Sequence, residues 1–185
     1  MTIAALVAAN TTLAASAGLL SSIFIVNIIE GWYSVFDACS GLLGGLVAIT
    51  AGAPVMSPPT AWFIGALAGP VYYFADRGIK RLGIDDAVGA FPVHGACGMW
   101  GLIATGLFHT ESLLHAFGAS NNRGTQIGYQ LLGMLIIIAW TSCTGLITFG
   151  SLNYGNIYSN VKCESDCFES LVFELKPKLK SRVWI

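Results

Sequence analysis

The stretch AVGAFPVHGACGMWGLIATGLFHT, residues 87–110, decides the fold of this chain. It contains no Asp, Glu, Lys or Arg. As a helix rising about 1.5 Å per residue, it would cross a bilayer core of about 30 Å. His94 lies inside it, so eight helical residues after Asp86 would place the imidazole about 12 Å inward, near the midplane. An ionisable group at that depth is costly, which makes His94 the first functional candidate.

The rest of the chain is almost as apolar. Hydrophobic residues make up 55% of the 185 residues, charged residues make up 10%, and the mean hydropathy is +0.69. Soluble domains carry roughly 25% charged residues. The composition therefore predicts an all-α fold, a polytopic membrane helix bundle. The net charge of −1, with no basic patch, gives no reason to expect a nucleic-acid partner.

Five transmembrane spans fit the apolar segments. Residues 38–75 are uncharged and would reach about 57 Å as one helix, so we expect Pro54, Pro58 and Pro59 to divide them. The predicted spans are residues 2–29, 36–53, 60–80, 86–108 and 126–152. Residues 1–155 would then form a membrane domain, and residues 156–185 a cytoplasmic tail of atypical sequence.

The basic residues predict an orientation. Three lie at the end of the third span or just after it, five follow the fifth span, and only Arg123 falls on the opposite side. Lys and Arg are enriched in cytoplasmic loops. We therefore expect a multi-pass protein of the plasma membrane, with its N-terminus outside and its C-terminus in the cytoplasm.

Small residues recur at helical spacing within three of the predicted spans. They are Gly41 and Gly45, then Ala61, Gly65 and Gly69, then Gly95, Gly98 and Gly101. Small side chains let membrane helices approach closely. The pattern therefore predicts a tightly packed bundle and indicates no binding or catalytic site.

His94 admits three interpretations from the residues alone. It could be a packing histidine bonded to a neighbouring helix, a hydrogen-bonding group that lines a pore, or a metal or cofactor ligand. The third is the least favoured because this span lacks a set of ligands. Asp85 or Asp86 is well placed to cap the fourth span.

The remaining histidines and the paired cysteines suggest no further site. We expect His109 and His115 to be solvated in an external loop. Cys163 and Cys167 form a C-x₃-C pair in the tail, which we interpret as incidental spacing because a zinc site needs four ligands. We predict no metal and no cofactor. We also predict that the protein is not an enzyme, because the sequence shows no nucleophile–base pair and no phosphate-binding loop.

Several ordered motifs resemble the ammonium transporter family (Amt/Mep/Rh). The motifs are AANTT at residues 8–12, DACSGLLGGLVAITAG at residues 37–52, Asp85-Asp86, Val93-His94-Gly95, Gly98, Gly101 and Gly106-Leu107-Phe108. The resemblance extends from residue 1 to about residue 155. It implies an eleven-helix protomer assembled as a trimer, with one narrow hydrophobic pore per protomer lined by two facing histidines.

On the family plan, the five spans resemble the seventh to eleventh helices. His94 then corresponds to the second pore histidine, and Asp86 to a structural acid at the start of its helix. The first six helices have no counterpart here, nor do the partner histidine and the outer aromatic recognition site that they carry. Residues 160–185 do not resemble the usual family tail. The chain therefore resembles a C-terminal part of such a transporter.

The resemblance implies transport of ammonium or ammonia across the membrane. The expected partners are ammonium, membrane lipid, and further subunits, either in a homotrimer or through association with full-length transporters. The alternative function is a non-conducting fragment that associates with full-length transporters and modulates them. An unrelated polytopic carrier with a chance histidine is a third reading.

Overall fold

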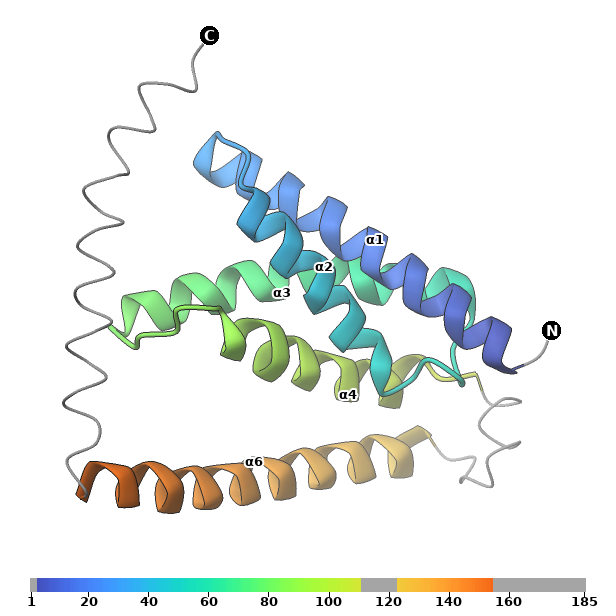
Figure 1. Ribbon diagram of the computed structural model, residues 1–185. Helices are drawn as coiled ribbons and strands as arrows, with labels where there is room; N and C mark the ends of the chain where they lie inside the picture. The colour runs from blue at the N-terminus through green and yellow to red at the C-terminus, as the bar shows by residue number, and fades with distance from the viewer. Residues whose placement is uncertain (1–2, 111–122, 155–185) are drawn as a thin grey trace, which may run out of the picture. The chain divides into compact units, whose positions relative to one another are not determined.

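The structure, a computed structural model, describes residues 3–110 and 123–154, and every regular element in these residues is a helix. The elements are α1 (Ile3–Glu30), α2 (Val35–Thr50), α3 (Pro58–Arg81), the π-helix η1 (Phe91–Ala96), α4 (Cys97–Phe108) and α6 (Arg123–Tyr154). Because η1 runs directly into α4, five continuous helices follow one another in the described chain (Figure 1). The all-helical prediction is confirmed.

The chain divides into two units, residues 1–135 and residues 136–185. The first unit holds α1 to α4 and the start of α6. The described part of the second unit is the remainder of α6. The packing and the sites described below belong to the first unit.

Successive helices of the first unit run in opposite directions. In the N-terminal part of α1, the Asn10 amide donates hydrogen bonds of 2.8 and 2.9 Å to the carbonyls of Ala53 and Met56, in the turn between α2 and α3. Thr110, just after α4, donates its backbone N–H to the carbonyl of Val55 in the same turn. One end of the bundle therefore gathers the start of α1, the α2–α3 turn and the end of α4.

Small residues bring α1, α2 and α3 into close contact. An ideal Cβ atom added at Gly65 would lie 2.6 Å from the Cα of Ala14, and one added at Gly18 would lie even closer to the carbonyl oxygen of Gly41. Both distances are too short for a real side chain, so the helix backbones can approach this closely only because these positions are glycines. The same is true of Gly41, Gly69 and Gly101. The predicted tight packing is confirmed at these positions.

In the third predicted series of small residues, which lies in η1 and α4, two glycines are not sites of close packing between helices. A Cβ atom at Gly98 would be in ordinary contact with Val47, at 3.7 Å. One at Gly95 would meet Phe91 of the same helix. Only Gly101 lies against the backbone of α2, at Ala48.

Prolines explain why two helices differ from the predicted spans. The helix α2 ends at Thr50 rather than at residue 53, because Pro54 lacks an amide proton and disfavours helical geometry in the preceding residue. The helix α3 begins at Pro58 rather than at residue 60, since proline is tolerated in a first turn. Beyond α3, Gly83 adopts a φ of +69° that lets the chain reverse.

Three helices in the described residues are long and apolar enough to cross a membrane. They are α1, the joined η1 and α4, and α6. The helix α2 is apolar but has only 16 residues, and α3 ends in charged residues.

Candidate functional site

The helix that carries His94 begins with one wide turn. Residues Phe91–Ala96 form a π-helix, in which the N–H of Cys97 donates to the carbonyl of Pro92. Pro92 lies in the first turn of this helix, where its missing N–H removes no helical hydrogen bond. Single π-turns are rare and often occur at functional sites.

Asp86 binds the start of this helix. Its two carboxylate oxygens accept hydrogen bonds from the N–H groups of Ala90 and Phe91, each at 2.8 Å. Such amides have no partner within a helix. Gly89, with a φ of +66°, allows the chain to turn between the carboxylate and the amides that it binds. Asp85 is exposed and has no hydrogen-bond partner in the part of the chain that the structure describes.

The helix starts later than the predicted span. We expected it to begin at Asp86, with eight helical residues leading to His94. Residues 84–89 are not helical, because Asp86 bonds forward to the amides at the helix start and Gly89 has a left-handed backbone. Three residues of η1 precede His94, so the depth estimated from helical rise was wrong.

The His94 side chain lies on the exposed side of its helix. Pro92, Val93 and Cys97 are buried on the other side. Among residues 3–110 and 123–154, the imidazole has no hydrogen-bond partner, so these helices do not supply the bond that a packing histidine would make. Both ring nitrogens are available to groups outside these helices.

Within the described ranges, no three His, Cys, Asp or Glu side chains gather in a way that could hold a metal ion. His115, Cys163 and Cys167 lie outside the described residues.

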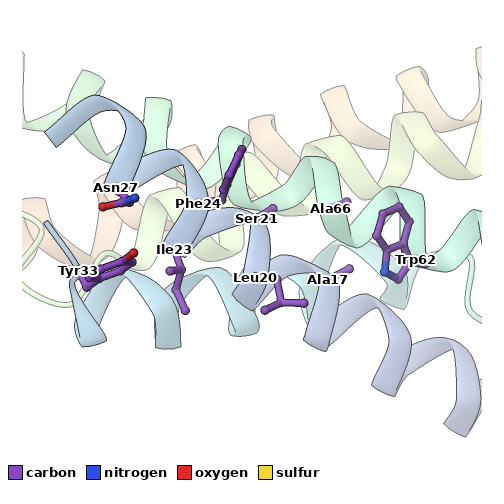
Figure 2. A pocket seen from close by; sticks show the side chains of 9 residues that line it. All are labelled: Ala17, Leu20, Ser21, Ile23, Phe24, Asn27, Tyr33, Trp62 and Ala66. Carbon is purple, nitrogen blue, oxygen red and sulfur yellow. The ribbon is translucent and has the colours of Figure 1, made fainter. Parts of the chain in front are cut away.

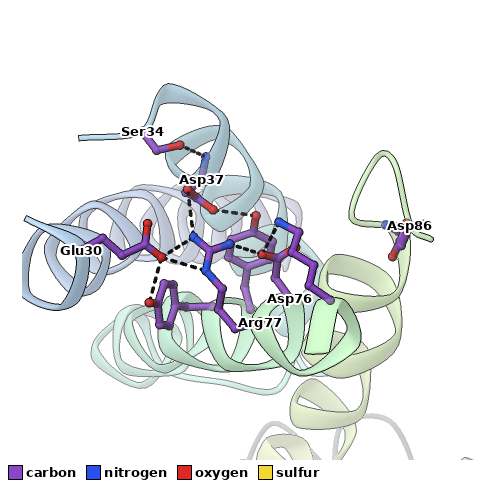
Figure 3. A network of polar contacts seen from close by, with 10 residues as sticks. Glu30, Ser34, Asp37, Asp76, Arg77 and Asp86 are labelled. Carbon is purple, nitrogen blue, oxygen red and sulfur yellow. Dashed lines mark hydrogen bonds and ion pairs between the residues drawn. The ribbon is translucent and has the colours of Figure 1, made fainter. Parts of the chain in front are cut away.

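A polar network that the sequence analysis missed joins the ends of α1 and α3 to the start of α2 (Figure 3). Arg77 is its centre. Its Nε and Nη2 atoms donate to Oε1 of Glu30 at 2.8 and 2.5 Å, and its other amino group contacts Asp76. Its Nη2 atom also lies 3.9 Å from Oδ2 of Asp37. Asp86 lies apart from this network.

Three further side chains complete the network. The hydroxyl of Tyr72 donates to Asp37 at 3.1 Å, the hydroxyl of Tyr73 donates to Glu30 at 3.0 Å, and Lys80 donates to Asp76 at 2.7 Å. Asp37 and Asp76 are almost fully buried, with side-chain exposures of 7% and 4%. Buried carboxylates require such partners. The network fixes the helix ends at this side of the bundle.

One sequence signal could have revealed this network. Glu30 and Asp37 are the only charged residues among the first 75, and each lies at the edge of a predicted span. An isolated acid beside apolar helices needs a cation, and Arg77 is the first basic residue in the chain.

His109 is buried, which contradicts the expectation of a solvated loop histidine. Its Nδ1 atom donates to the carbonyl of Thr105 at 3.2 Å, and the adjacent bond from Thr110 to Val55 holds the chain against the end of the bundle. Its Nε2 atom is buried without a hydrogen-bond partner in the described residues.

An open groove lies between α1 and α3 (Figure 2). It has a volume of about 490 Å³ and is mainly apolar. Large exposed side chains border it, among them Leu20, Phe24, Tyr33 and Trp62, and Ser21 and Asn27 contribute polar atoms.

Comparison with known proteins finds ammonium transporters, both as a family profile and as individual relatives. The profile of the Ammonium Transporter Family matches residues 2–156. Putative ammonium transporter 1 member 5 of Arabidopsis thaliana is 37% identical over 147 residues, which cover 74% of this chain and 30% of that protein. Ammonium transporter Amt2 of Archaeoglobus fulgidus is 38% identical over 152 residues, which cover 78% of this chain and 32% of that protein.

The fold is also found in solved structures. The structure of a Sensor Amt Protein is similar with a TM-score of 0.75 and 31% sequence identity, over 82% of this chain and 37% of that one. The chain thus spans about a third of the length of the proteins that it matches. With its long apolar helices it is a multi-pass integral membrane protein, and its relatives are transporters rather than enzymes. Because the family profile covers most of its length, the chain belongs to the ammonium transporter family.

Proposed function

We propose that this chain forms the C-terminal part of an ammonium-conducting unit and that His94 lines the conducting path. The observation that carries the proposal is the position of the imidazole. It lies exposed and without a described partner on a helix whose opposite side is buried. The substrate is inferred from the family, whose members are ammonium transporters.

The chemistry of imidazole suits this role. A bare ammonium ion in an apolar environment faces a large desolvation cost, which a pathway can reduce by separating the proton from the neutral amine. A neutral imidazole offers one hydrogen-bond donor and one acceptor. An ordinary imidazole also gains or loses a proton near physiological pH, so it can take part in proton transfer. His94 would supply one half of a histidine pair, and a further set of helices would supply the other half.

We propose that these five helices alone do not conduct selectively. The side of η1 that carries His94 is open, so a closed path needs further helices to cover it. Reconstitution of the purified 185-residue chain in liposomes tests this point. Saturable ammonium flux from the chain by itself would contradict it.

The role of His94 can be tested in a chimaera. Residues 2–156 would replace the matching part of Archaeoglobus fulgidus Amt2, and methylammonium uptake would be measured with and without competing K⁺. His94→Ala should abolish uptake or its selectivity over K⁺. Leu107→Ala, which truncates another exposed side chain of the same helix, should leave both intact. Unchanged uptake and selectivity in the His94 variant would refute the assignment.

A second function is association with complete transporter subunits, which the chain would modulate without conducting. The apolar groove between α1 and α3, bordered by Phe24 and Trp62, favours it because it offers a large exposed surface to another helix (Figure 2). Co-purification with a tagged full-length transporter, and its loss in Trp62→Ala, would support this function. A homotrimer of the complete unit is the expected assembly.

We further propose that the protein lies in the plasma membrane with its N-terminus outside and its C-terminus in the cytoplasm. Eight of the nine basic residues then lie on the cytoplasmic side. The ion pairs of Arg77 and Lys80 with acids leave this argument intact, since orientation follows Lys and Arg rather than net charge. A glycosylation site added before Ile3 should be modified in a eukaryotic host, and a site added after Ile185 should not.

A further inference from the structure

We propose that the π-turn η1 aims His94 away from the bundle core and that Phe91 is the positioning residue that holds this turn. The functional importance of this π-turn rests on the proposed role of His94 in conduction. Its geometry can be tested without any transport measurement.

The argument begins with the periodicity of helices. Residues three apart in a regular α-helix lie on one face. Cys97, three residues after His94, has no exposed surface, and its thiol donates to the carbonyl of Ala68 in α3 at 3.5 Å. A regular α-helix through this segment would therefore direct His94 toward the core, beside Cys97.

The π-turn changes that direction. Its hydrogen bonds join residues five apart, so each residue turns the chain through a smaller angle than in an α-helix. His94 consequently leaves the face occupied by Cys97 and becomes exposed, while Val93 is buried. The wide turn thus accounts for the one feature of His94 on which a pore role depends.

Phe91 packs against the backbone of Gly95 across this turn. An ideal Cβ atom at Gly95 would lie 2.8 and 3.1 Å from Cδ2 and Cε2 of the Phe91 ring, so the ring occupies the space that a side chain would need. The N–H of Phe91 is held by Asp86 at 2.8 Å. Phe91 is therefore anchored through its backbone on one side and its ring on the other. Both contacts stabilise the first part of η1.

Nuclear magnetic resonance of the histidine rings can test this inference. The chain has three histidines, so labelling with ¹⁵N-histidine in the purified 185-residue chain, in nanodiscs, gives three sets of ring signals, and His94→Gln identifies one set. A small neutral nitroxide, which enters both water and lipid, should broaden the His94 signals strongly. Phe91→Ala should remove this broadening, whereas Phe91→Tyr, which keeps the ring, should retain it.

Matched variants separate this effect from a general loss of structure. Phe108→Ala, which removes another exposed aromatic ring of the same helix, should leave the broadening of His94 unchanged. Gly95→Ala should act like Phe91→Ala, and the double variant should show little more than either alone, because both changes break one contact. Deletion of Ala96 should also remove the broadening, since it shortens the wide turn by one residue.

Persistent broadening of His94 in Phe91→Ala, in Gly95→Ala and in the deletion variant, with helical circular dichroism retained, would overturn the inference. The proposed function has a separate test. Normal selective uptake by the His94→Ala chimaera would refute the role in conduction and leave the orientation result standing.

Discussion

Nε and Nη2 of Arg77 donate to the same oxygen, Oε1 of Glu30, at 2.8 and 2.5 Å, and so tie the end of α3 to the end of α1. The planar guanidinium provides several donors in a fixed arrangement, which a lysine ammonium group cannot reproduce. Arg77 is also the cation nearest to the buried carboxylates of Asp76 and Asp37. Its loss would leave these acids with too little positive charge beside them.

Arg77→Ala should therefore lower the free energy of unfolding by about 3 kcal/mol, the cost of removing one partner of a buried ion pair. Arg77→Lys should cost less, because it keeps the charge and loses the double contact. Unfolding by sodium dodecyl sulfate in mixed micelles, followed by circular dichroism, measures both effects. Lys80→Ala is the control: its side chain is 54% exposed and that of Arg77 is 26% exposed, so the loss should be about 1 kcal/mol or less. Equal losses in the alanine variants of Arg77 and Lys80 would contradict the central role of Arg77.

The two adjacent acids before α4 should differ in their effects. Asp86→Ala removes both acceptors of the Ala90 and Phe91 amides and should cost about 1 kcal/mol, as for other helix caps. Asp85→Ala should have almost no effect, since the exposed Asp85 has no partner in the described chain. Amide hydrogen exchange at Ala90 and Phe91 gives the local readout, which should accelerate only in the Asp86 variant. Equal exchange in the two variants would exclude Asp86 as the cap.

Asn10 should be the most sensitive polar position at the other end of the bundle. Its amide satisfies two buried carbonyls, of Ala53 and Met56, and a buried acceptor left without a donor costs about 1–3 kcal/mol. Asn10→Ala and Asn10→Asp should both destabilise the bundle by at least about 2 kcal/mol, because alanine has no donor and an ionised aspartate only accepts hydrogen bonds. Thr12→Ala is the control: Thr12 is exposed and bonds only to carbonyls of its own helix, so the stability should change little. The same mixed-micelle unfolding distinguishes these outcomes.

The sequence predicted those features of the fold that depend on long apolar runs. Segments such as residues 2–29 and 126–152 are unambiguous, and the observed helices Ile3–Glu30 and Arg123–Tyr154 match them within a few residues. The ordered motifs also predicted the family correctly. The positions of helix ends were less predictable near proline, because Pro54 ends one helix early while Pro58 begins another.

The polar details of the site depend on contacts between distant residues, which one sequence does not reveal. Glu30 and Arg77 are 47 positions apart, and only the packing of α1 on α3 brings them together. His109 is buried because Thr110 bonds to Val55 in another turn. The π-turn is different: Pro92 and Gly95 fit an ordinary α-helix start equally well, so no local pattern distinguishes the wide turn that exposes His94.

Gly65 provides the sharpest test of helix packing. A methyl group added there would lie 2.6 Å from the Cα of Ala14, an atom of the α1 backbone that cannot move aside alone. Gly65→Ala should therefore separate α1 from α3 and cost about 1–3 kcal/mol, as other overpacked substitutions do. Gly145→Ala is the matched control in α6. An added methyl group there has no neighbour within 4 Å among the described residues, so helix propensity should make the change neutral or stabilising. If Gly65→Ala were as stable as Gly145→Ala in mixed-micelle unfolding, the close approach of α1 and α3 would be wrong.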